Sequence, residues 1–508
     1  MPPLTRSPLI VLGIDAGDPD FLMTWAREGH LPTLSRIMER GAWGRTGGAE
    51  AISEHGVWVS IFSGISRRDH GYFYFRQMKP GTYDLHTVTG LDVDAPPFWT
   101  CLEPDGRRFA VVDIPDYDPV AGLPGIQLAH WATHNNWDPS HFVTAAEPPE
   151  VLEEVARRFA PRLVTVENHD SSIEEDLRIL GELLARVEMK GAACRALLER
   201  GPFNLVTIVF AESHTANHQF WRHRPEIDAA TRADPRLRTA IRDVYIAIDR
   251  ELGLLLERLP DEANVLVVSS VGMEDDFPAT GLIEAFCRGF GYQVAPSPGA
   301  VSRRPMDWVR RLVPERTRVA LSRRLSREAR ELLLAGQFRA STDWNQTRAF
   351  ALPSAYTSFI RVNLRGREPS GIVAAGGEYE ALLDGIEADL ATLIDPDSGE
   401  PAVVGTTRTS AAFDCDPHPT LPDLWVDWKP GRFLRRVVHP GGELVQDRPD
   451  FYRRSDHGRQ GFFAAAGPRI AARGDLGEVD ILDLAPTFLA LLGEPPATRM
   501  RGRPIDVL

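Results

Sequence analysis

The sequence predicts an α/β protein with a mostly parallel central sheet and helices on both faces of that sheet. Short apolar runs recur along the chain, most of them followed by a helical pattern, at residues 9–14, 109–113, 205–210, 265–268 and 462–466. The runs are continuous rather than alternating, which is typical of strands covered on both faces. Ligands of such sheets lie beyond the carboxyl ends of the strands, so the polar residues that follow these runs are the first candidates for a functional site.

Two longer segments, 173–200 and 235–258, have the charged and periodic pattern of amphipathic helices. A further helix is expected directly after the first strand. Asp18 is a good cap for it, because Pro19 follows and suits the first helical position.

The composition changes at residues 291–345. Between residues 303 and 339 there are eleven arginines against four acidic residues, a local charge of +7 in a chain of −14. We interpret 291–345 as a helical insertion or cap, whose arginines form either a solvated face or a cover over an anionic substrate. The predicted division is therefore a catalytic core of residues 1–290 and 346–508 with the insertion 291–345.

Length and charge exclude several classes of protein. A chain of 508 residues buries enough surface to need neither disulfides nor a structural metal. The net charge of −14 argues against nucleic acid as a partner, since such binding needs a basic face. The four scattered cysteines favour reduced thiols in a cytoplasmic protein. Neither a signal-peptide pattern nor a run of about 18 apolar residues is present, so we expect no membrane partner.

The sharpest chemical signal is Glu-Ser-His-Thr-Ala-Asn-His at residues 212–218, directly after the run 205–210. In a helix, His214 and His218 lie four residues apart on one face, where two imidazoles can share a metal; the alternative is a pair of solvated or core histidines. His457, in a polar turn before the run 462–466, would complete a three-histidine set with an open coordination position, as catalytic zinc uses.

Two other turns carry candidate groups. Asp15 ends the first apolar run and is either a metal ligand or a helix cap. Ser53 can cap the helix that contains Trp58, or its hydroxyl can be an activated oxygen at a helix N-terminus. Glu54 and His55 add a carboxylate and an imidazole to the same turn.

In their order along the chain, these motifs resemble the type I phosphodiesterase/nucleotide pyrophosphatase branch of the alkaline phosphatase superfamily. The resemblance runs almost end to end, through Gly13-Ile-Asp15, His30-Leu-Pro-Thr-Leu, Trp58 to Gly64 with His70-Gly71, His218-Gln-Phe-Trp221, Asp456-His457 and Asp483-Leu-Ala-Pro-Thr487. It implies an alkaline phosphatase-like sheet that carries two adjacent metal ions, usually zinc, and a Thr or Ser nucleophile that attacks phosphorus.

Carried over residue by residue, the resemblance implies one complete metal site. His218 and His457 match histidine ligands of the family, and His214 stands where the family commonly has aspartate. The second metal site departs from the family pattern, because Ser270 and Val271 stand where a carboxylate and an imidazole are expected.

Of the second site, Asp15 remains as a ligand. Glu54, or one of the acidic residues at 274–276, is a candidate substitute for the lost ligands. The family spacing places Glu54 at the nucleophile position, as a metal ligand or general base. A shift of one residue in the loop would make Ser53 the nucleophile instead, and we expect Ser53 to have that role.

The sequence therefore predicts a metal-dependent hydrolase of a phosphoester, similar to phosphodiesterases or nucleotide pyrophosphatases, or of a related anionic ester. We expect a small anionic substrate and one zinc ion, with a second zinc or another divalent metal left open, as is the oligomeric state. Two alternatives stay open: a one-metal enzyme repurposed for a transfer or elimination in small-molecule biosynthesis, and a non-catalytic binding protein on a decayed hydrolase scaffold. His130, His134 and His141 either line the substrate pocket or pack within their own loop.

Overall fold

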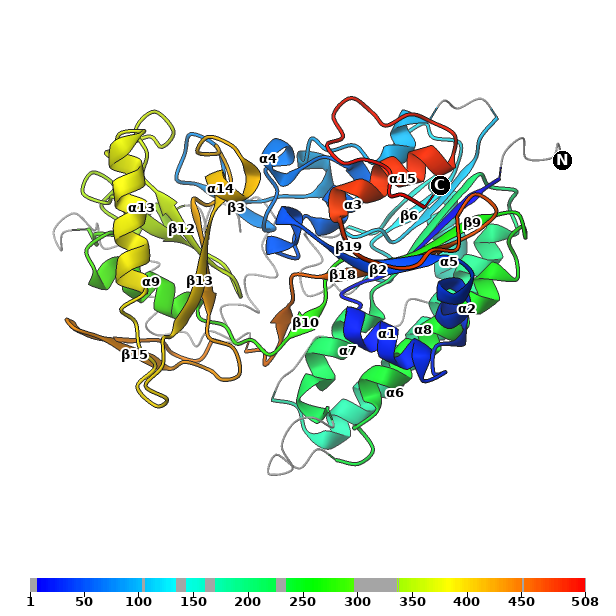
Figure 1. The fold of residues 1–508 in the computed structure, drawn as a ribbon, viewed down its shortest axis with the longest axis horizontal. Helices are drawn as coiled ribbons and strands as arrows, with labels where there is room; N and C mark the ends of the chain where they lie inside the picture. The colour runs from blue at the N-terminus through cyan, green and yellow to red at the C-terminus, as the bar shows by residue number, and fades with distance from the viewer. Residues whose placement is uncertain are drawn as a thin grey trace. The chain divides into compact units, whose positions relative to one another are not determined.

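The computed structural model describes residues 7–102, 106–133, 143–159, 170–224, 234–296, 336, 338–449 and 452–507 (Figure 1). The chain forms two compact units, Met1–His70 with Thr89–Asp275 and Arg453–Leu508, and Gly71–Val88 with Asp276–Tyr452. Most of the predicted insertion 291–345 lies outside the described residues, as do His134 and His141. The predicted division into a core and a cap therefore stays a prediction.

The first unit is built around a nine-stranded sheet in the order β19-β2-β18-β9-β1-β8-β5-β6-β7. Its strands are β1 (Leu9–Ile14), β2 (Ala42–Gly47), β5 (Phe109–Val112), β6 (Gly125–Ala129), β7 (Ala145–Glu147), β8 (Leu205–Phe210), β9 (Asn264–Ser269), β18 (Gly461–Ala466) and β19 (Gly474–Asp480). The five central strands from β9 to β6 run parallel to one another, whereas β18 is antiparallel to both β9 and β2. The predicted mostly parallel sheet is confirmed.

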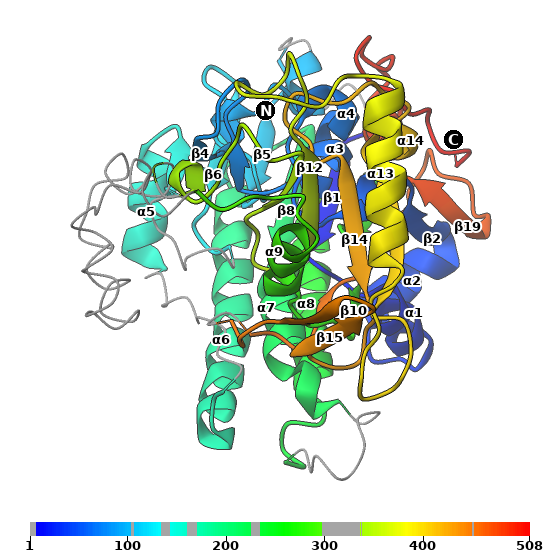
Figure 2. The ribbon, with the colours of Figure 1, turned by 90° about the vertical axis from the view of Figure 1, so that its left-hand side faces the viewer.

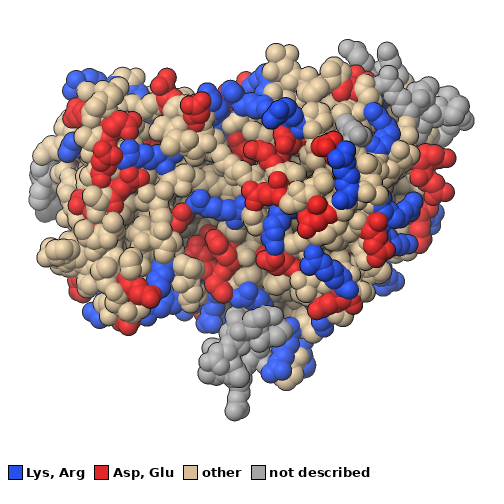
Figure 3. Space-filling model, in the orientation of Figure 1, with Lys and Arg blue, Asp and Glu red and all other residues tan. Residues whose placement is uncertain are grey.

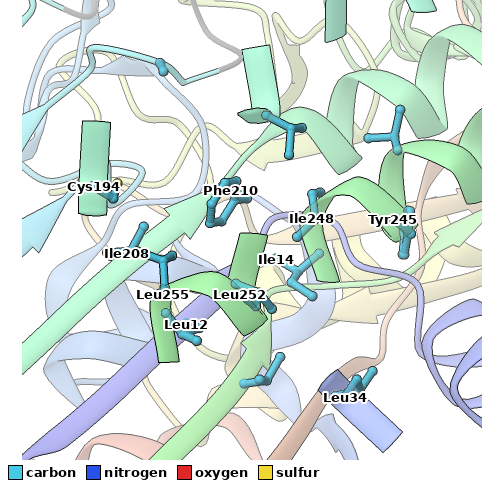
Figure 4. Packing of buried hydrophobic residues seen from close by; sticks show 14 of the residues in the cluster. Leu12, Ile14, Leu34, Cys194, Ile208, Phe210, Tyr245, Ile248, Leu252 and Leu255 are labelled. Atoms are coloured by element: carbon cyan, nitrogen blue, oxygen red, sulfur yellow. The ribbon is translucent and has the colours of Figure 1, made fainter. Parts of the chain in front are cut away.

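Helices cover both faces of this sheet, because successive side chains of each buried strand point to opposite faces. In β1, Ile10, Leu12 and Ile14 belong to one core cluster, whereas Leu9 and Val11 belong to another. On the first face, Figure 4 shows Leu12 and Ile14 of β1 packed with Leu252 and Leu255 of the helix that crosses them.

The helices of the first face are α1 (Pro19–Arg27), α2 (Pro32–Arg40), α5 (Glu150–Arg158), α6 (Ile173–Leu198), α7 (Glu212–Phe220) and α8 (Ala240–Leu256), with η4 (Trp221–His223) after α7. The second face is covered by α3 (Val57–Ser63), α15 (Leu484–Leu491), η1 (Ala49–Ile52), η3 (Phe98–Cys101) and η6 (Ile481–Asp483). The short elements α4 (Arg67–His70) and η2 (Gly90–Asp92) complete these connections. Helices α6 and α8, which lie side by side in Figure 2, confirm the two predicted amphipathic helices.

The two predicted helix caps have different outcomes. The Asp18 side chain accepts hydrogen bonds from the backbone N–H groups of Asp20 and Phe21 at the start of α1, which confirms that cap. The interpretation of Ser53 as the cap of the next helix is wrong, because α3 is capped by Gly56 in a left-handed conformation with φ 86°. Glycine adopts this conformation without the steric cost that a side chain would add.

The second unit contains a four-stranded antiparallel sheet in the order β11-β12-β14-β13. Its strands are β11 (Ala349–Leu352), β12 (Ser358–Val362), β13 (Val403–Arg408) and β14 (Leu424–Trp428). Its helices are α9 (Thr280–Gly289), α13 (Gly377–Leu390) and α14 (Thr409–Phe413), and two hairpins pair β3 (Arg76–Met78) with β4 (Leu85–Thr87) and β15 (Arg436–His439) with β16 (Gly442–Val445). A separate apolar core, which includes Phe286, Ile360 and Leu383, holds this unit together.

Among the residues that the structure describes, no helix is both long enough and apolar enough to cross a membrane. Acidic and basic side chains are interspersed over the face shown in Figure 3.

Candidate metal centre

The structure brings the three predicted histidines together at one edge of the nine-stranded sheet. His214 and His218 lie on α7, which begins directly after β8, and His457 lies on β17 (Asp456–His457), just before β18. Strand β17 pairs with β10 (Met273–Glu274). The ring centroids are 4.8 Å apart for His214 and His218, 4.8 Å for His214 and His457, and 4.9 Å for His218 and His457.

Helix α7 is buried along its whole length, and polar side chains fix it against the end of β1. The Ser213 hydroxyl donates to the carbonyl of Asp15 at 2.6 Å, and the Asn217 amide donates to the carbonyl of Ala16 at 2.7 Å. Ala16 has a positive φ of 47°, a strained conformation that persists because its surroundings hold it. These contacts fix the position of the helix that carries two of the imidazoles.

Each of the three imidazoles has a polar partner at Nδ1. Nδ1 of His214 lies 3.1 Å from the Asp15 carboxylate, and Nδ1 of His218 lies 3.1 Å from the Ser455 hydroxyl. Nδ1 of His457 lies 2.8 Å from the Asp456 carboxylate. Histidines that bind a metal almost always use the second ring nitrogen in this way, which orients the ring. For His214 and His218, Nε2 is therefore the nitrogen that the ring would present to a metal.

The spacing of the donor atoms also fits a metal. Nε2 of His218 and Nε2 of His457 are 3.3 Å apart. Two nitrogens bound to one tetrahedral zinc at 2.0–2.1 Å would be about 3.3 Å apart. One donor atom from each of Glu54, His214, His218 and His457 lies within 4.8 Å of the other three. Nη1 of Arg453 lies 2.9 Å from Nε2 of His218, so this guanidinium would have to move aside for a metal.

Glu54 approaches this group from the turn between η1 and α3, where its carboxylate contacts Nδ1 of His457. Burial lowers the pKa of His457, but the carboxylates of Glu54 and Asp456 outweigh that effect and raise the pKa above its ordinary value. An environment that favours a positive charge on an imidazole also favours a bound cation.

Asp15 is surrounded by hydrogen-bond donors. Besides its contact with His214, its carboxylate accepts from the Trp58 indole N–H at 2.7 Å and from the Ser270 hydroxyl at 3.1 Å. Ser270 is one of the two residues that depart from the family pattern, and Val271 beside it is buried. The geometry thus gives Asp15 a role in orienting His214, whereas its predicted role as ligand of a second metal stays a prediction.

A cleft opens next to the imidazoles. It is lined by Asp15, Glu54, His55, Trp58, Pro115, Asp116, His214, Ser270, Val271 and His457. Among the described residues that line it, Glu54 is present and Ser53 is not. The structure therefore brings Glu54, rather than Ser53, to the cleft.

Several residues of this region were not predicted from the sequence to belong to the site. Asp116 lines the cleft, and the same rule that singled out Asp15 points to it, since it follows a buried strand. Ser455 and Asp456 precede His457 in the sequence, but no local pattern shows that they contact two different imidazoles. His130, in contrast, is buried beside Asp118, at 3.5 Å, and is not among the described residues that line the cleft.

Comparisons with known proteins agree with this fold. The model of the type I phosphodiesterase/nucleotide pyrophosphatase family matches residues 9–285. Phosphonoacetate hydrolase from Sinorhizobium meliloti 1021, solved with phosphonoformate, has a similar structure with a TM-score of 0.51 and 13% identity, over 97% of this chain and 96% of that one. Murine ectonucleotide pyrophosphatase/phosphodiesterase 5 gives a TM-score of 0.48 and 13% identity, over 96% of each chain. No curated protein sequence matches the chain. Because the family match spans more than half of the sequence, from the first strand to α9, the chain belongs to the type I phosphodiesterase/nucleotide pyrophosphatase family.

Proposed function

We propose that the protein is a metal-dependent hydrolase of a phosphoester or a related anionic ester, acting on a small anionic substrate. The observation that carries this proposal is the set of three imidazoles whose Nδ1 atoms contact Asp15, Ser455 and Asp456. Such contacts are typical of metal ligands and hold the three rings around a common point. Membership of the family supports the reaction class.

His214, His218 and His457 would hold the metal, with Glu54 as the fourth donor. Three imidazoles and a carboxylate form a ligand set that suits zinc, although other divalent metals accept it. When bound, the metal supplies a Lewis acid for an ester oxygen and lowers the pKa of bound water.

The protein's own side chains prepare the site. Asp15, Ser455 and Asp456 orient the rings, and buried α7 keeps two of the rings in place. Glu54 lines the cleft, where its carboxylate can accept a proton from an attacking hydroxyl group. Ser53 remains the alternative residue at the nucleophile position. Its absence from the described lining of the cleft argues for Glu54 at that position.

The donors around Asp15 support a single-metal site. An indole N–H and a hydroxyl already donate to Oδ1 of this carboxylate, and Nδ1 of His214 contacts Oδ2. Most of the lone pairs of Asp15 are therefore already used by hydrogen-bond partners. This observation also supports the second candidate function, a one-metal enzyme that carries out a transfer or an elimination.

The test is the metal content of the purified protein, together with turnover of an aryl phosphodiester, an aryl phosphomonoester and an aryl sulfate. We expect about one metal per chain and turnover of at least one substrate. His214→Ala and His457→Ala should abolish both, whereas His439→Ala, in the second unit, should leave both unchanged. Bound metal without turnover of any substrate would favour a transfer or elimination, and a protein with neither metal nor turnover would refute the proposal.

A further inference from the structure

A buried arginine, Arg67, forms hydrogen bonds with the turn that carries Glu54. The Arg67 side chain is fully buried, and its guanidinium donates to three backbone carbonyls of this turn. Nη2 donates to the carbonyls of Glu50 at 2.8 Å and Ser53 at 3.0 Å, and Nη1 donates to the carbonyl of His55 at 2.7 Å. One side chain thus binds the turn on both sides of Glu54.

The Glu50 carboxylate keeps this arginine in place. Glu50 is itself buried and forms an ion pair with the guanidinium, with Nε and Oε2 3.8 Å apart. It also accepts from the hydroxyl of Ser66 at 2.6 Å and from that of Ser60 at 2.9 Å. A buried charge is tolerated only when it is paired and hydrogen-bonded. Arg67 is therefore fixed by groups from η1, α3 and the turn before α4.

The three carbonyl contacts determine which side chain reaches the cleft. Arg67 holds the Ser53 carbonyl and so fixes the peptide plane before Glu54. The Glu54 carbonyl, in the plane after it, accepts from the Val57 N–H at 3.0 Å, and Arg67 holds the next carbonyl, that of His55. Together these contacts fix the direction of the Glu54 side chain. Ser53 is extended, with φ −153° and ψ 144°, and successive side chains of extended backbone point to opposite sides. This agrees with the lining of the cleft, which includes Glu54 but not Ser53.

We infer that Arg67 is the positioning residue that presents Glu54, in place of Ser53, to the three imidazoles. The inference rests on the proposed function for the role of Glu54 as fourth metal donor. Lysine at position 67 would be a poor substitute, because its single ammonium group lacks the planar fork that spans several carbonyls.

The first experiment measures Co²⁺ affinity by calorimetry and the visible absorption of the Co²⁺ complex, which reports the ligand set. Arg67→Lys should weaken Co²⁺ binding by about tenfold, as expected for a lost supporting contact, and should shift the spectrum toward that of Glu54→Gln. In the Glu54→Gln background, Arg67→Lys should cause no further loss of affinity. An equal loss in both backgrounds would mean a purely structural role and would overturn the inference.

The matched control is Arg361→Lys in the second unit. Arg361 is also buried, donates to the carbonyls of Leu421 and Pro419, and pairs with Glu368. Its replacement should leave Co²⁺ affinity within twofold of the wild type.

The second experiment uses metal-free protein, so that it does not depend on the proposed function. Hydrogen exchange of a peptide covering residues 50–56 should be at least tenfold faster in Arg67→Lys, with the exchange of α8 unchanged. If Arg67→Lys does not fold, the double variant Glu50→Gln, Arg67→Met replaces the charge pair and serves for both measurements. Unchanged exchange would refute the role of Arg67 in holding the turn. Faster exchange in Arg67→Lys, together with a wild-type protein that binds no Co²⁺, would support that role and refute the proposed function.

Discussion

The Asp15 carboxylate lies 3.1 Å from Nδ1 of His214 and joins the end of β1 to α7. This contact favours the tautomer with hydrogen on Nδ1, which leaves the lone pair of Nε2 for a metal. Carboxylate–histidine pairs of this kind raise the basicity of a metal ligand and fix the plane of its ring.

Replacement of Asp15 by asparagine should therefore weaken metal binding by about 10- to 100-fold. The amide keeps the shape of the side chain but loses the negative charge that supports His214. Metal affinity measured by competition with a chromophoric chelator checks this. Asp176→Asn, which alters a buried aspartate 2.7 Å from His223, is the control and should leave the affinity unchanged; equal losses in both variants would contradict the role of Asp15.

Ser53→Ala and Glu54→Gln should have opposite outcomes. Because Glu54 lines the cleft and contacts His457, Glu54→Gln should lower turnover by at least about 100-fold, as expected for a group that transfers a proton. Ser53→Ala should keep turnover within about twofold of the wild type, since the loss expected of a removed nucleophile is far larger. Steady-state kinetics on the best aryl ester measures both variants. A large loss of turnover in Ser53→Ala would contradict this prediction and indicate that the Ser53 hydroxyl is the nucleophile.

Removal of the metal should destabilise the first unit. A ligand that binds only the folded state at 100 times its Kd adds about 2.7 kcal/mol to the free energy of unfolding. Zinc added to chelator-treated protein should raise the thermal midpoint accordingly. The same addition to His457→Ala should leave the midpoint unchanged, and an equal rise in that variant would place the stabilising metal elsewhere.

Acid should weaken the hydrogen bonds that Asp176 forms at the start of α6. Burial alone would raise the pKa of Asp176, but hydrogen bonds from His223, Ser171, Arg222 and Gln219 outweigh it and lower the pKa to about 2, from 3.8. The folded state therefore favours the carboxylate, and its contribution of about 2 kcal/mol is complete above about pH 4 and is lost as the pH falls toward 2. Urea unfolding at pH 5 and pH 3 should show a smaller difference in Asp176→Asn than in the wild type.

The buried pair of Lys190 and Asp113 should be costly to break. Nζ of Lys190 lies 2.9 Å from the Asp113 carboxylate, and both side chains are fully buried. Lys190→Met would leave that carboxylate without its counter-charge and should cost about 3–5 kcal/mol of unfolding free energy. Lys429→Met, which breaks the exposed pair with Glu400, should cost less than about 1 kcal/mol; similar costs for the two variants would contradict this explanation.

The sequence was most informative about the buried strands of the central sheet. The apolar runs 9–14 and 205–210 coincide with β1 and β8. Short, continuous apolar runs of this length are typical of strands that are buried on both faces. The order of the motifs also identified the family, which brings His214, His218 and His457 together. The contacts that orient these rings were not predictable from sequence. Ser455 and His218, for example, are 237 residues apart, and no local pattern encodes such a pair.

The local sequence pattern led to a wrong prediction for the turn before α3. A serine near the start of a helix is most often a cap, yet Gly56 takes that position. The residue that organises the turn, Arg67, comes after the helix, and an arginine in a charged segment is ordinarily a surface residue. Its role depends on Glu50, Ser60 and Ser66 being buried beside it, which only the tertiary structure shows.

The direction of β18 has a consequence for biosynthesis. This strand fills the place between β9 and β2 and runs against both. If its six residues ran the other way, His457 would stand about 20 Å from the other two imidazoles. A growing chain that has left the ribosome only up to residue 450 holds His214 and His218 but neither His457 nor the strand that closes the gap in the sheet. On the proposed function, the protein should therefore stay inactive during translation and bind metal only late in its maturation.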